Sequence, residues 1–393
     1  MAKKRGNNEG CITRRKDGRW QGAVTIGRDP ESGELIRKFF YGRTRREEAE
    51  KVAKALAEVQ AGMVSPKGGK VTFGEWLRTW LETYKRPHVR QTTWENYETI
   101  VRKHVPEKLA ATPLEKVRAE ELQNLYLAKE KEGLSARTVR LLHVVIHAAL
   151  KQAVKLGYVP RNVADATTPP RVRRKEIRVL TREDVGRFLD AARGHRLFAA
   201  FHLLVGTGVR RGEVLGLRWQ DVDLDAGAVT VERSLVASRS GLIFQEPKTK
   251  SGRRRIPLPR DVVKSLKARR VRWKEERLKL GPDWPHTDLV FPSEAGTPIH
   301  PRNFLRAFKL VLQKAGLPGT VTIHALRHTY ATLLLEAGEH PKVVQEILGH
   351  SSITVTLDTY SKVMPGLKER AAEKMDRILA EIKSPSKKRR KGK

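Results

Sequence analysis

The sequence predicts a multidomain α+β protein: a small β-sheet-plus-helix domain, then an all-α domain, then a mixed, mainly α domain with a small antiparallel sheet. The 393 residues are too many for one ordinary domain. Residues 62–70 and 164–176 lack apolar periodicity and contain Gly, Ser or Pro beside basic residues, which is typical of linkers. Runs of β-forming residues precede the first linker, and helical patterns follow it.

Residues 1–63 are predicted to form the sheet domain. The runs WQGAVTI and LIRKFFY are typical of strands, and turn sequences lie at Asp17-Gly18 and at residues 29–33. Thr44, with Glu47 three residues later, indicates the start of a helix. The cations on these strands are interpreted as a β-ribbon that binds in a DNA groove, with a solvated outer face as the alternative. They are Arg14, Arg15, Lys16, Arg19, Arg28, Arg37 and Lys38.

Residues 70–163 are predicted to be helical. Thr72 and Glu75 form a capping signal ahead of WLRTWLETY, and helical patterns follow at TTWENYETIVRKHV, AEELQNLYLAKEKEG and SARTVRLLHVVIHAALKQAVKLG. His143 and His147 lie four residues apart in the last pattern. Since no carboxylate or third histidine accompanies them, we interpret them as the edge of a packed helix rather than as metal ligands.

Residues 177–383 are predicted to mix helices and strands. Thr181 and Asp184 cap a helix that runs through Ala192, and a second apolar helix ends at Gly206. VTVERSLV, LIFQEPKT and RRRIPLP predict consecutive strands, with TKSG at a hairpin tip between the last two. Helices are expected again at residues 302–315 and from His324 onward. Residues 384–393 are predicted to be a disordered basic tail.

The charge predicts a polyanionic partner. Lys and Arg number 79 against 44 Asp and Glu, which gives a net charge of +35 and a sequence pI near 10.5. A membrane partner is not expected, since the sequence shows no basic amphipathic helix flanked by Trp or Phe and no apolar run near the ~18 residues that span a bilayer. Cys11 is the only cysteine. With no apolar segment after the basic start, this suits a cytoplasmic protein.

Several side chains of the third segment fit the task of breaking a DNA strand without a metal. Such a site must neutralise the phosphate oxygens, supply a nucleophile and protonate the leaving oxygen. Arg210 follows a Gly-Thr-Gly turn that opens a helix, where backbone N–H groups favour an anion, and Glu213 one turn later can hold it. His324 and Arg327 share a helix face with His328 because they lie three and four residues apart. The remaining candidates are Lys250 in TKSG, His350 in LGHSS and Tyr360 in TLDTYSKV.

These residues carry a family resemblance. The third segment resembles the catalytic domain of the tyrosine recombinases, the phage integrase family, through TGVRRGE, TKSGRRRIPL, HALRHTYAT, LGHSS and TLDTYSKV in that order. The second segment is similar to the core-site-binding domain of that family. The first resembles the small arm-binding domain of integrases that act on mobile elements.

The resemblance implies a role for each matching residue. Arg210 and Arg327 would clamp the scissile phosphate, and Tyr360 would become joined to the 3′ phosphate while a 5′-hydroxyl leaves. Lys250 would be the general acid, His324 would assist proton transfer and His350 would hydrogen-bond the phosphate. This covalent chemistry needs no metal, cofactor or ATP. The implied partners are double-stranded DNA with core and arm-type sites, a tetramer on that DNA, a host DNA-bending protein and a directionality factor.

The sequence leaves alternatives open at two positions and in the function. Tyr330, three residues after Arg327, is a rival nucleophile, and Lys248 is a rival for Lys250. A catalytically silent DNA-binding regulator of the same fold and a type IB topoisomerase are the other functions considered beside a site-specific integrase.

Overall fold

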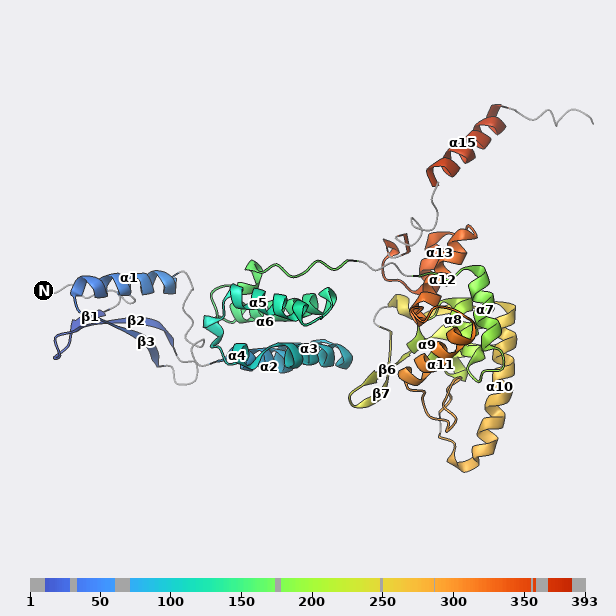
Figure 1. Ribbon diagram of the computed structural model, residues 1–393, viewed down its shortest axis with the longest axis horizontal. Coiled ribbons are helices and arrows are strands. Elements are labelled where there is room, and N and C mark those ends of the chain that lie inside the picture. Colours follow the sequence, from blue (N-terminus) through green and yellow to red (C-terminus); the bar gives the residue numbers. More distant parts are fainter. Residues whose placement is uncertain are drawn as a thin grey trace, which may run out of the picture. The chain divides into compact units, whose positions relative to one another are not determined.

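The computed structural model confirms the predicted fold class: helices predominate and the sheets are small and antiparallel (Figure 1). The chain divides into two compact units, Met1–Arg174 and Lys175–Lys393. Within the described part, no helix is long and apolar enough to cross a lipid bilayer. The structure describes residues 11–28, 34–60, 71–173, 178–247, 250–285, 287–354, 356–357 and 367–383.

The first unit begins with a three-stranded antiparallel sheet that α1 (Arg45–Gln60) covers on one face (Figure 1). Its strands are β1 (Cys11–Arg14), β2 (Trp20–Arg28) and β3 (Leu35–Gly42), in that order. Val24, Val52 and Ala55 form the buried centre of this small core. A Cβ on Gly22 would lie 2.3 Å from Val52 Cγ2, so the glycine permits the close approach of helix and sheet.

The remainder of the first unit is helical and has its own core. Its elements are α2 (Phe73–Thr79), a π-helical turn at Trp80–Lys85, a 3₁₀ turn at Arg86–His88, α3 (Gln91–His104), α4 (Glu107–Ala110), a 3₁₀ turn at Leu114–Lys116, α5 (Ala119–Lys131), α6 (Ala136–Lys155) and a 3₁₀ turn at Val163–Ala166. The capping box of Thr72 and Glu75 is present at α2. Trp76 is buried against α6, where its Nε1 donates to the carbonyl of Ala149 at 2.9 Å.

One expectation for this region is wrong: a carboxylate does accompany the paired histidines. His147 Nε2 lies 2.7 Å from Asp165 Oδ1, because the turn at Val163–Ala166 folds back onto α6. His143 Nδ1 contacts the hydroxyl of Thr167 at 3.2 Å. The described residues contain no cluster of three or more potential metal ligands.

The second unit has one large core. Its helices are α7 (Arg182–Ala192), α8 (Phe198–Thr207), α9 (Arg211–Gly216), α10 (Arg260–Leu280), α11 (Pro301–Lys314), α12 (Ile323–Glu336), α13 (Pro341–Leu348) and α15 (Leu367–Lys383), with 3₁₀ turns at Trp219–Asp221 and Gly281–Asp283. α8 contacts both α10 and α12, which places it at the centre. Phe201 on α8 packs with Phe188 on α7 and Phe308 on α11, with ring centroids 5.5 to 6.3 Å apart.

The predicted strand order is wrong in this unit. β4 (Val222–Asp223), β5 (Ala228–Val231) and β8 (Arg254–Pro257) form one sheet, whereas β6 (Ser234–Ser238) and β7 (Gly241–Gln245) form a separate hairpin. VTVERSLV is therefore split between two sheets. Arg233 marks the break: its Nε donates to the carbonyl of Gly216 at 2.8 Å, and its guanidinium lies 4.1 Å from the ring centroid of Phe244. Since β8 pairs with β5, TKSG does not cap a hairpin, and Lys250–Gly252 is a 3₁₀ turn.

Candidate active site

Four of the predicted catalytic residues come together around the C-terminal end of α13. Arg210 is the N-cap residue of α9, His324 and Arg327 lie in the first turns of α12, and His350 follows α13. The backbone of Lys250 is described, but its side chain is not. Tyr360 and Lys248 lie outside the described residues.

α12 carries its two histidines and its arginine near its N-terminal end. The Thr322 hydroxyl caps the helix by accepting from the Ala325 N–H at 3.1 Å. The His324 and His328 rings meet edge to face, with centroids 4.8 Å apart, while Leu326 on the other side enters the core. The sequence prediction that His324, Arg327 and His328 share one face agrees with this arrangement.

Arg327 is buried and held by two backbone carbonyls. Its side chain donates from Nη1 to Gly208 at 2.9 Å and from Nη2 to Leu348 at 2.6 Å, and the residue is only 3% exposed. Burial, together with the charge of Arg210, lowers the pKa of Arg327 to about 9, which leaves it protonated at neutral pH. These two bonds use two of the five N–H groups of the guanidinium, so donors remain for an anion.

Arg210 is more exposed and is fixed by a buried carboxylate. Its Nη1 lies 2.8 Å from Glu213 Oε1, and its Nη2 is 3.3 Å from the carbonyl oxygen of Gly349. Glu213 also accepts from the backbone N–H of Arg210 at 2.9 Å, so it acts as the predicted tether. Burial raises the pKa of Glu213, but hydrogen bonds and charges from Arg254 and Arg210 outweigh burial and keep the pKa below its ordinary value.

The site histidines are neutral at physiological pH. Burial and the charges of Arg327 and Arg210 lower the pKa of His350 to about 3. Burial and the neighbouring His324 lower the pKa of His328 to about 4, and burial and Arg327 lower that of His324. His350 Nδ1 lies 2.9 Å from the hydroxyl of the buried Thr356, which leaves Nε2 available for a ligand.

The turn that carries Lys250 lies against the end of α13. Gly349 has a φ of +65° and ends that helix. A Cβ at Gly349 would lie 2.8 Å from the carbonyl oxygen of Ser251, so the two backbones are in direct contact. The backbone of Lys250–Gly252 is thereby brought to the cluster of arginines and histidines.

Comparisons with known proteins decide the family. The phage integrase family model matches residues 178–365, and the phage integrase N-terminal SAM-like domain model matches residues 72–129. The chain is 34% identical over 372 residues to the XerC-like tyrosine recombinase of Caldanaerobacter subterraneus subsp. tengcongensis, with 90% of this chain and 94% of that protein covered. The chain belongs to the tyrosine recombinase family. Membership makes it a tyrosine-type site-specific DNA recombinase.

Other relatives extend the likeness over most of the chain. The ICEBs1 integrase of Bacillus subtilis is 27% identical over 377 residues, with 94% of this chain and 100% of that protein covered. The Tn1549 transposon integrase, solved in complex with transposon right end DNA, has a TM-score of 0.67 at 25% identity and covers 79% of this chain and 100% of its own. A lambda integrase dimer bound to a COC' core site shares the fold, with a TM-score of 0.57 at 22% identity, 91% of this chain and 96% of that chain.

Two residues of this candidate site were not predicted from the sequence. Arg254 is paired with Glu213, and Thr356 contacts His350. A signal for Arg254 exists: alternation along β8 places it on the same side as the fully buried Ile256. Thr356 gives no such signal, because its contact depends on how the chain folds after α13.

Tyr330, the rival nucleophile, is packed into a small apolar cluster. Its ring lies among Leu335, Val344 and Leu348 on α12 and α13. Burial raises the pKa of Tyr330 to about 12, with a smaller contribution from Glu339. Both features disfavour a phenolate at this position.

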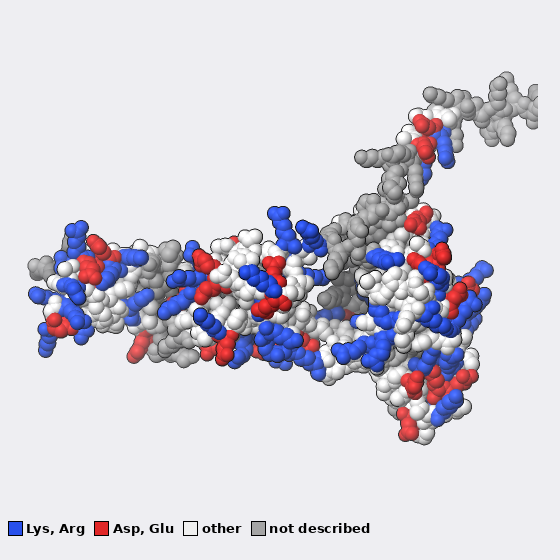
Figure 2. Space-filling view, in the orientation of Figure 1, with Lys and Arg blue, Asp and Glu red and all other residues white. Residues whose placement is uncertain are grey.

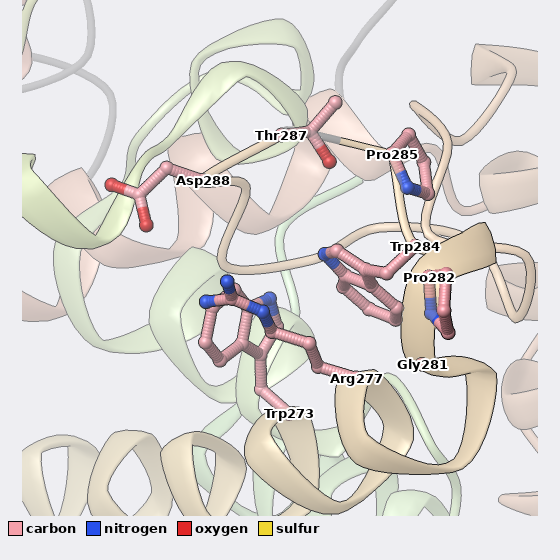
Figure 3. Close-up of a pocket in the computed structure, with 8 residues that line it drawn as sticks. All are labelled: Trp273, Arg277, Gly281, Pro282, Trp284, Pro285, Thr287 and Asp288. Carbon is pink, nitrogen blue, oxygen red and sulfur yellow. The ribbon is translucent and has the colours of Figure 1, made fainter.

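A pocket of about 310 Å³ lies elsewhere in the second unit, at the end of α10 (Figure 3). Trp273 and Trp284 form two of its walls, with ring centroids 5.8 Å apart, and Arg277 lies over Trp273. None of the residues predicted to be catalytic lines it. The arginine cluster is instead partly open at Arg210, as a site for a long polymer must be.

The predicted cations of the sheet domain do not share one face. The register pairs Gln21 with Tyr41, Ala23 with Phe39 and Thr25 with Arg37, so these side chains point away from α1. Phe39 and Tyr41 are each 49% exposed, and the Arg15 guanidinium lies 5.5 Å from the Tyr41 ring centroid. Lys38 lies on the opposite side, over Phe40. The aromatic members of this outer face were missed by the sequence analysis.

Basic side chains are spread widely over the molecule. Figure 2 shows Lys and Arg interspersed with Asp and Glu on the visible surface of both units. Charge alone therefore does not locate the contact with a polyanion. On the outer sheet face exposed aromatic rings accompany the arginines, as the exposed ring of Phe244 accompanies Arg233 on the β6–β7 hairpin.

Proposed function

We propose that this recombinase cleaves and rejoins DNA through a covalent bond between Tyr360 and a 3′ phosphate, and that it integrates or excises a phage or other mobile element. The observation that carries this proposal is the convergence of Arg210 and Arg327 on the carbonyls at the end of α13, with Glu213 as the buried tether. Two fixed guanidinium groups are suited to a phosphate, because their planar donors match its oxygens and remain charged.

The arginines stabilise charge that builds on the non-bridging oxygens. Arg327 is immobilised by Gly208 and Leu348 before DNA arrives, so little reorganisation is needed during the reaction. Arg210 is more exposed and can meet the phosphate first.

In this mechanism, His350 donates to the phosphate in its neutral form. In this proposal the Thr356 hydroxyl, 2.9 Å from Nδ1, is the donor, so the imidazole proton lies on Nε2, the nitrogen left for the phosphate. A neutral ring also avoids adding a further cation beside Arg210 and Arg327.

The covalent step exchanges one phosphate ester for another. The Tyr360 hydroxyl oxygen bonds to phosphorus while the bond to the 5′ oxygen breaks; His324 assists removal of the phenolic proton, and Lys250 protonates the 5′ oxygen. Lys248 is the alternative acid. A 5′-hydroxyl from another strand reverses the step, so no metal, cofactor or ATP is required.

We assign the DNA contacts to separate parts of the chain. In this proposal residues 70–163 bind the core site, residues 1–63 bind arm-type sites through the outer sheet face, residues 177–383 catalyse, and residues 384–393 add a basic tail. Lambda integrase is known as a dimer on a core site and as a tetramer on a Holliday junction. We infer a tetramer on DNA here too, with a host DNA-bending protein and a directionality factor as helpers in the cytoplasm.

Covalent trapping tests the proposal. Purified protein is incubated in EDTA with nicked duplexes that span the DNA beside its own gene, and adducts are resolved on a denaturing gel. Wild type and Tyr330→Phe should form an adduct, and Tyr360→Phe should not. An adduct that survives in Tyr360→Phe but disappears in Tyr330→Phe would assign the nucleophile to Tyr330.

The same assay separates the alternative functions. Tight DNA binding with no adduct from any duplex would favour a silent regulator. Relaxation of supercoiled DNA without sequence preference would favour a type IB topoisomerase. Loss of the wild-type adduct in EDTA would contradict metal-independent chemistry.

A further inference from the structure

Arg254 joins three segments that carry predicted catalytic residues. Its Nη2 lies 2.8 Å from Glu213 Oε2 on α9, and its Nε donates to the carbonyl of Ile347 on α13 at 2.5 Å. Its Nη1 donates to the carbonyl of Gly252, in the turn that begins at Lys250, at 3.1 Å. The side chain is only 6% exposed, so these contacts are made away from solvent.

The carboxylate of Glu213 is shared between a buried and an exposed arginine. Oε1 accepts from Arg210 Nη1 at 2.8 Å and from Arg254 Nη1 at 3.3 Å. Oε2 accepts from the Arg210 backbone N–H at 2.9 Å and from Arg254 Nη2 at 2.8 Å. The orientation of Arg210 therefore depends on a carboxylate that also accepts hydrogen bonds from the buried Arg254.

Gly349 packs closely against Arg254. A Cβ at Gly349 would lie 3.0 Å from Arg254 Cδ and 3.1 Å from its Nη1, and 2.8 Å from the Ser251 carbonyl oxygen. The end of α13 thus rests directly on the Arg254 side chain. His350 is the next residue, and the carbonyls of Leu348 and Gly349 are those that hold Arg327 and Arg210.

We propose that Arg254 is a positioning residue for recombination: it fixes Glu213, the end of α13 and the Lys250 turn in one arrangement, from which Arg210, Arg327 and Lys250 act on the phosphate. The inference rests on the proposed function of this site. In this proposal Arg254 does not touch the phosphate itself, because Glu213, Ile347 and Gly252 accept four hydrogen bonds from its five N–H groups and the side chain is only 6% exposed.

A guanidinium is needed for this role. Lysine keeps the charge but cannot bond Glu213 with two nitrogens while a third nitrogen meets Ile347. Methionine has a similar shape and removes the charge, which leaves the Glu213 carboxylate buried beside Arg210 alone.

Loss of Arg254 has a pH signature. Burial raises the pKa of Glu213, and Arg254 supplies the strongest opposing influence. In its absence the pKa of Glu213 rises, so the carboxyl becomes protonated as the pH falls and releases Arg210. The rate of adduct formation should then fall more steeply toward pH 5 than the wild-type rate does.

The experiment compares full-length wild type, Arg254→Met, Arg254→Lys and Arg255→Met. Arg255 is the matched control, since it is the next residue on β8, points to the other side of the strand and pairs with Asp223 at the exposed surface. Circular dichroism checks folding, gel shift measures binding to a core-site duplex, and single-turnover adduct formation is followed from pH 5 to pH 8.

Arg254→Met should form adduct about tenfold more slowly or worse at neutral pH, with an added loss toward pH 5 and near-unchanged duplex binding. Arg254→Lys should be about threefold slower with the wild-type pH profile. Arg255→Met should match wild type throughout.

Equal rates and pH profiles in all four proteins would overturn the role of Arg254 and leave phosphotyrosyl chemistry standing. If Arg254→Met does not fold, a wild-type rate in Arg254→Lys overturns the role in the same way. Absence of adduct from wild type and every variant would overturn the proposed function and this inference together.

Discussion

The arginine cluster of the second unit and the outer sheet face of the first use the same residue type in opposite ways. Arg327 and Arg254 are buried, and backbone carbonyls and one carboxylate fix their guanidinium groups. Arg37 on β3 and Arg15, just after β1, are exposed, and exposed aromatic rings accompany them. Burial with fixed partners suits the stabilisation of one transition state, whereas exposure suits adaptable, salt-dependent contact with a polymer.

This difference explains why residue type alone did not locate the site. The sequence carries 79 Lys and Arg. The arginines of the candidate site are distinguished by the hydrogen-bond partners that fix their side chains. These contacts involve α8, α9, α13 and β8 together.

The largest effect is expected at Arg327. Arg327→Ala should slow strand cleavage by about 10² to 10³-fold, because one preorganised donor to the transition-state oxygens is removed, while DNA binding persists. Single-turnover cleavage and gel shift measure the two quantities. Arg302→Ala, an exposed arginine on α11, is the control. Loss of binding together with cleavage in folded Arg327→Ala protein would contradict the catalytic role.

Removal of residues 1–63 tests the role of the outer sheet face in DNA binding. On DNA that carries arm and core sites, affinity should fall by about 10² or more, because two linked binding modules gain avidity. On a core-site duplex alone, adduct formation should stay near wild type, since the sheet domain has its own core. Failure of the truncated protein to cleave the core duplex would show that this domain is not a separable arm binder.

A smaller effect is expected at Thr356. Thr356→Val keeps the buried shape but removes the hydroxyl that orients His350, so cleavage should slow by about three- to tenfold. Thr356→Ser keeps the hydroxyl and should restore most of the rate. If Thr356→Val and Thr356→Ser cleave DNA at the same rate, the hydroxyl does not orient His350.

The smallest effect is the contribution of His350 to the pH dependence of stability. The pKa of His350 is about 3 in the folded protein against an ordinary 6.5. Between these two pH values the unfolded chain binds a proton that the folded protein does not bind, so the free energy of unfolding falls as the pH falls from 6.5. Thermal unfolding between pH 6.5 and 5 should show a smaller decrease for His350→Asn than for wild type. The isolated residues 1–63 contain no histidine and should lack this contribution; an unchanged slope in His350→Asn would contradict it.

Local signals predicted the helices well. The capping boxes at Thr72–Glu75 and Thr181–Asp184 are present, because both halves of each lie within three residues of the other. The strands of the second unit were misjudged, because β8 pairs with β5 across more than twenty intervening residues that include the β6–β7 hairpin. Asp165 beside His147 was missed for the same reason.

The side chains of the candidate site could be predicted from the sequence better than the contacts that hold them in place. The motifs identified Arg210, Glu213, His324, Arg327 and His350, and the structure brings these together. The contacts that hold them are backbone carbonyls at Gly208, Leu348 and Gly349, which have no signature in side-chain identity. The spacing of motifs therefore identifies the candidate reactive side chains, but it does not identify the backbone contacts that fix them.

The most direct test of the account is to identify the tyrosine that becomes linked to DNA. Adduct formed by the unmodified protein is digested with trypsin and nuclease, and the nucleotide-bearing peptide is sequenced by mass spectrometry. Residues 343–362 contain Tyr360 as their only tyrosine, and residues 328–342 contain only Tyr330. The account predicts the added nucleotide mass on the peptide 343–362, and its presence on 328–342 would contradict the proposed nucleophile.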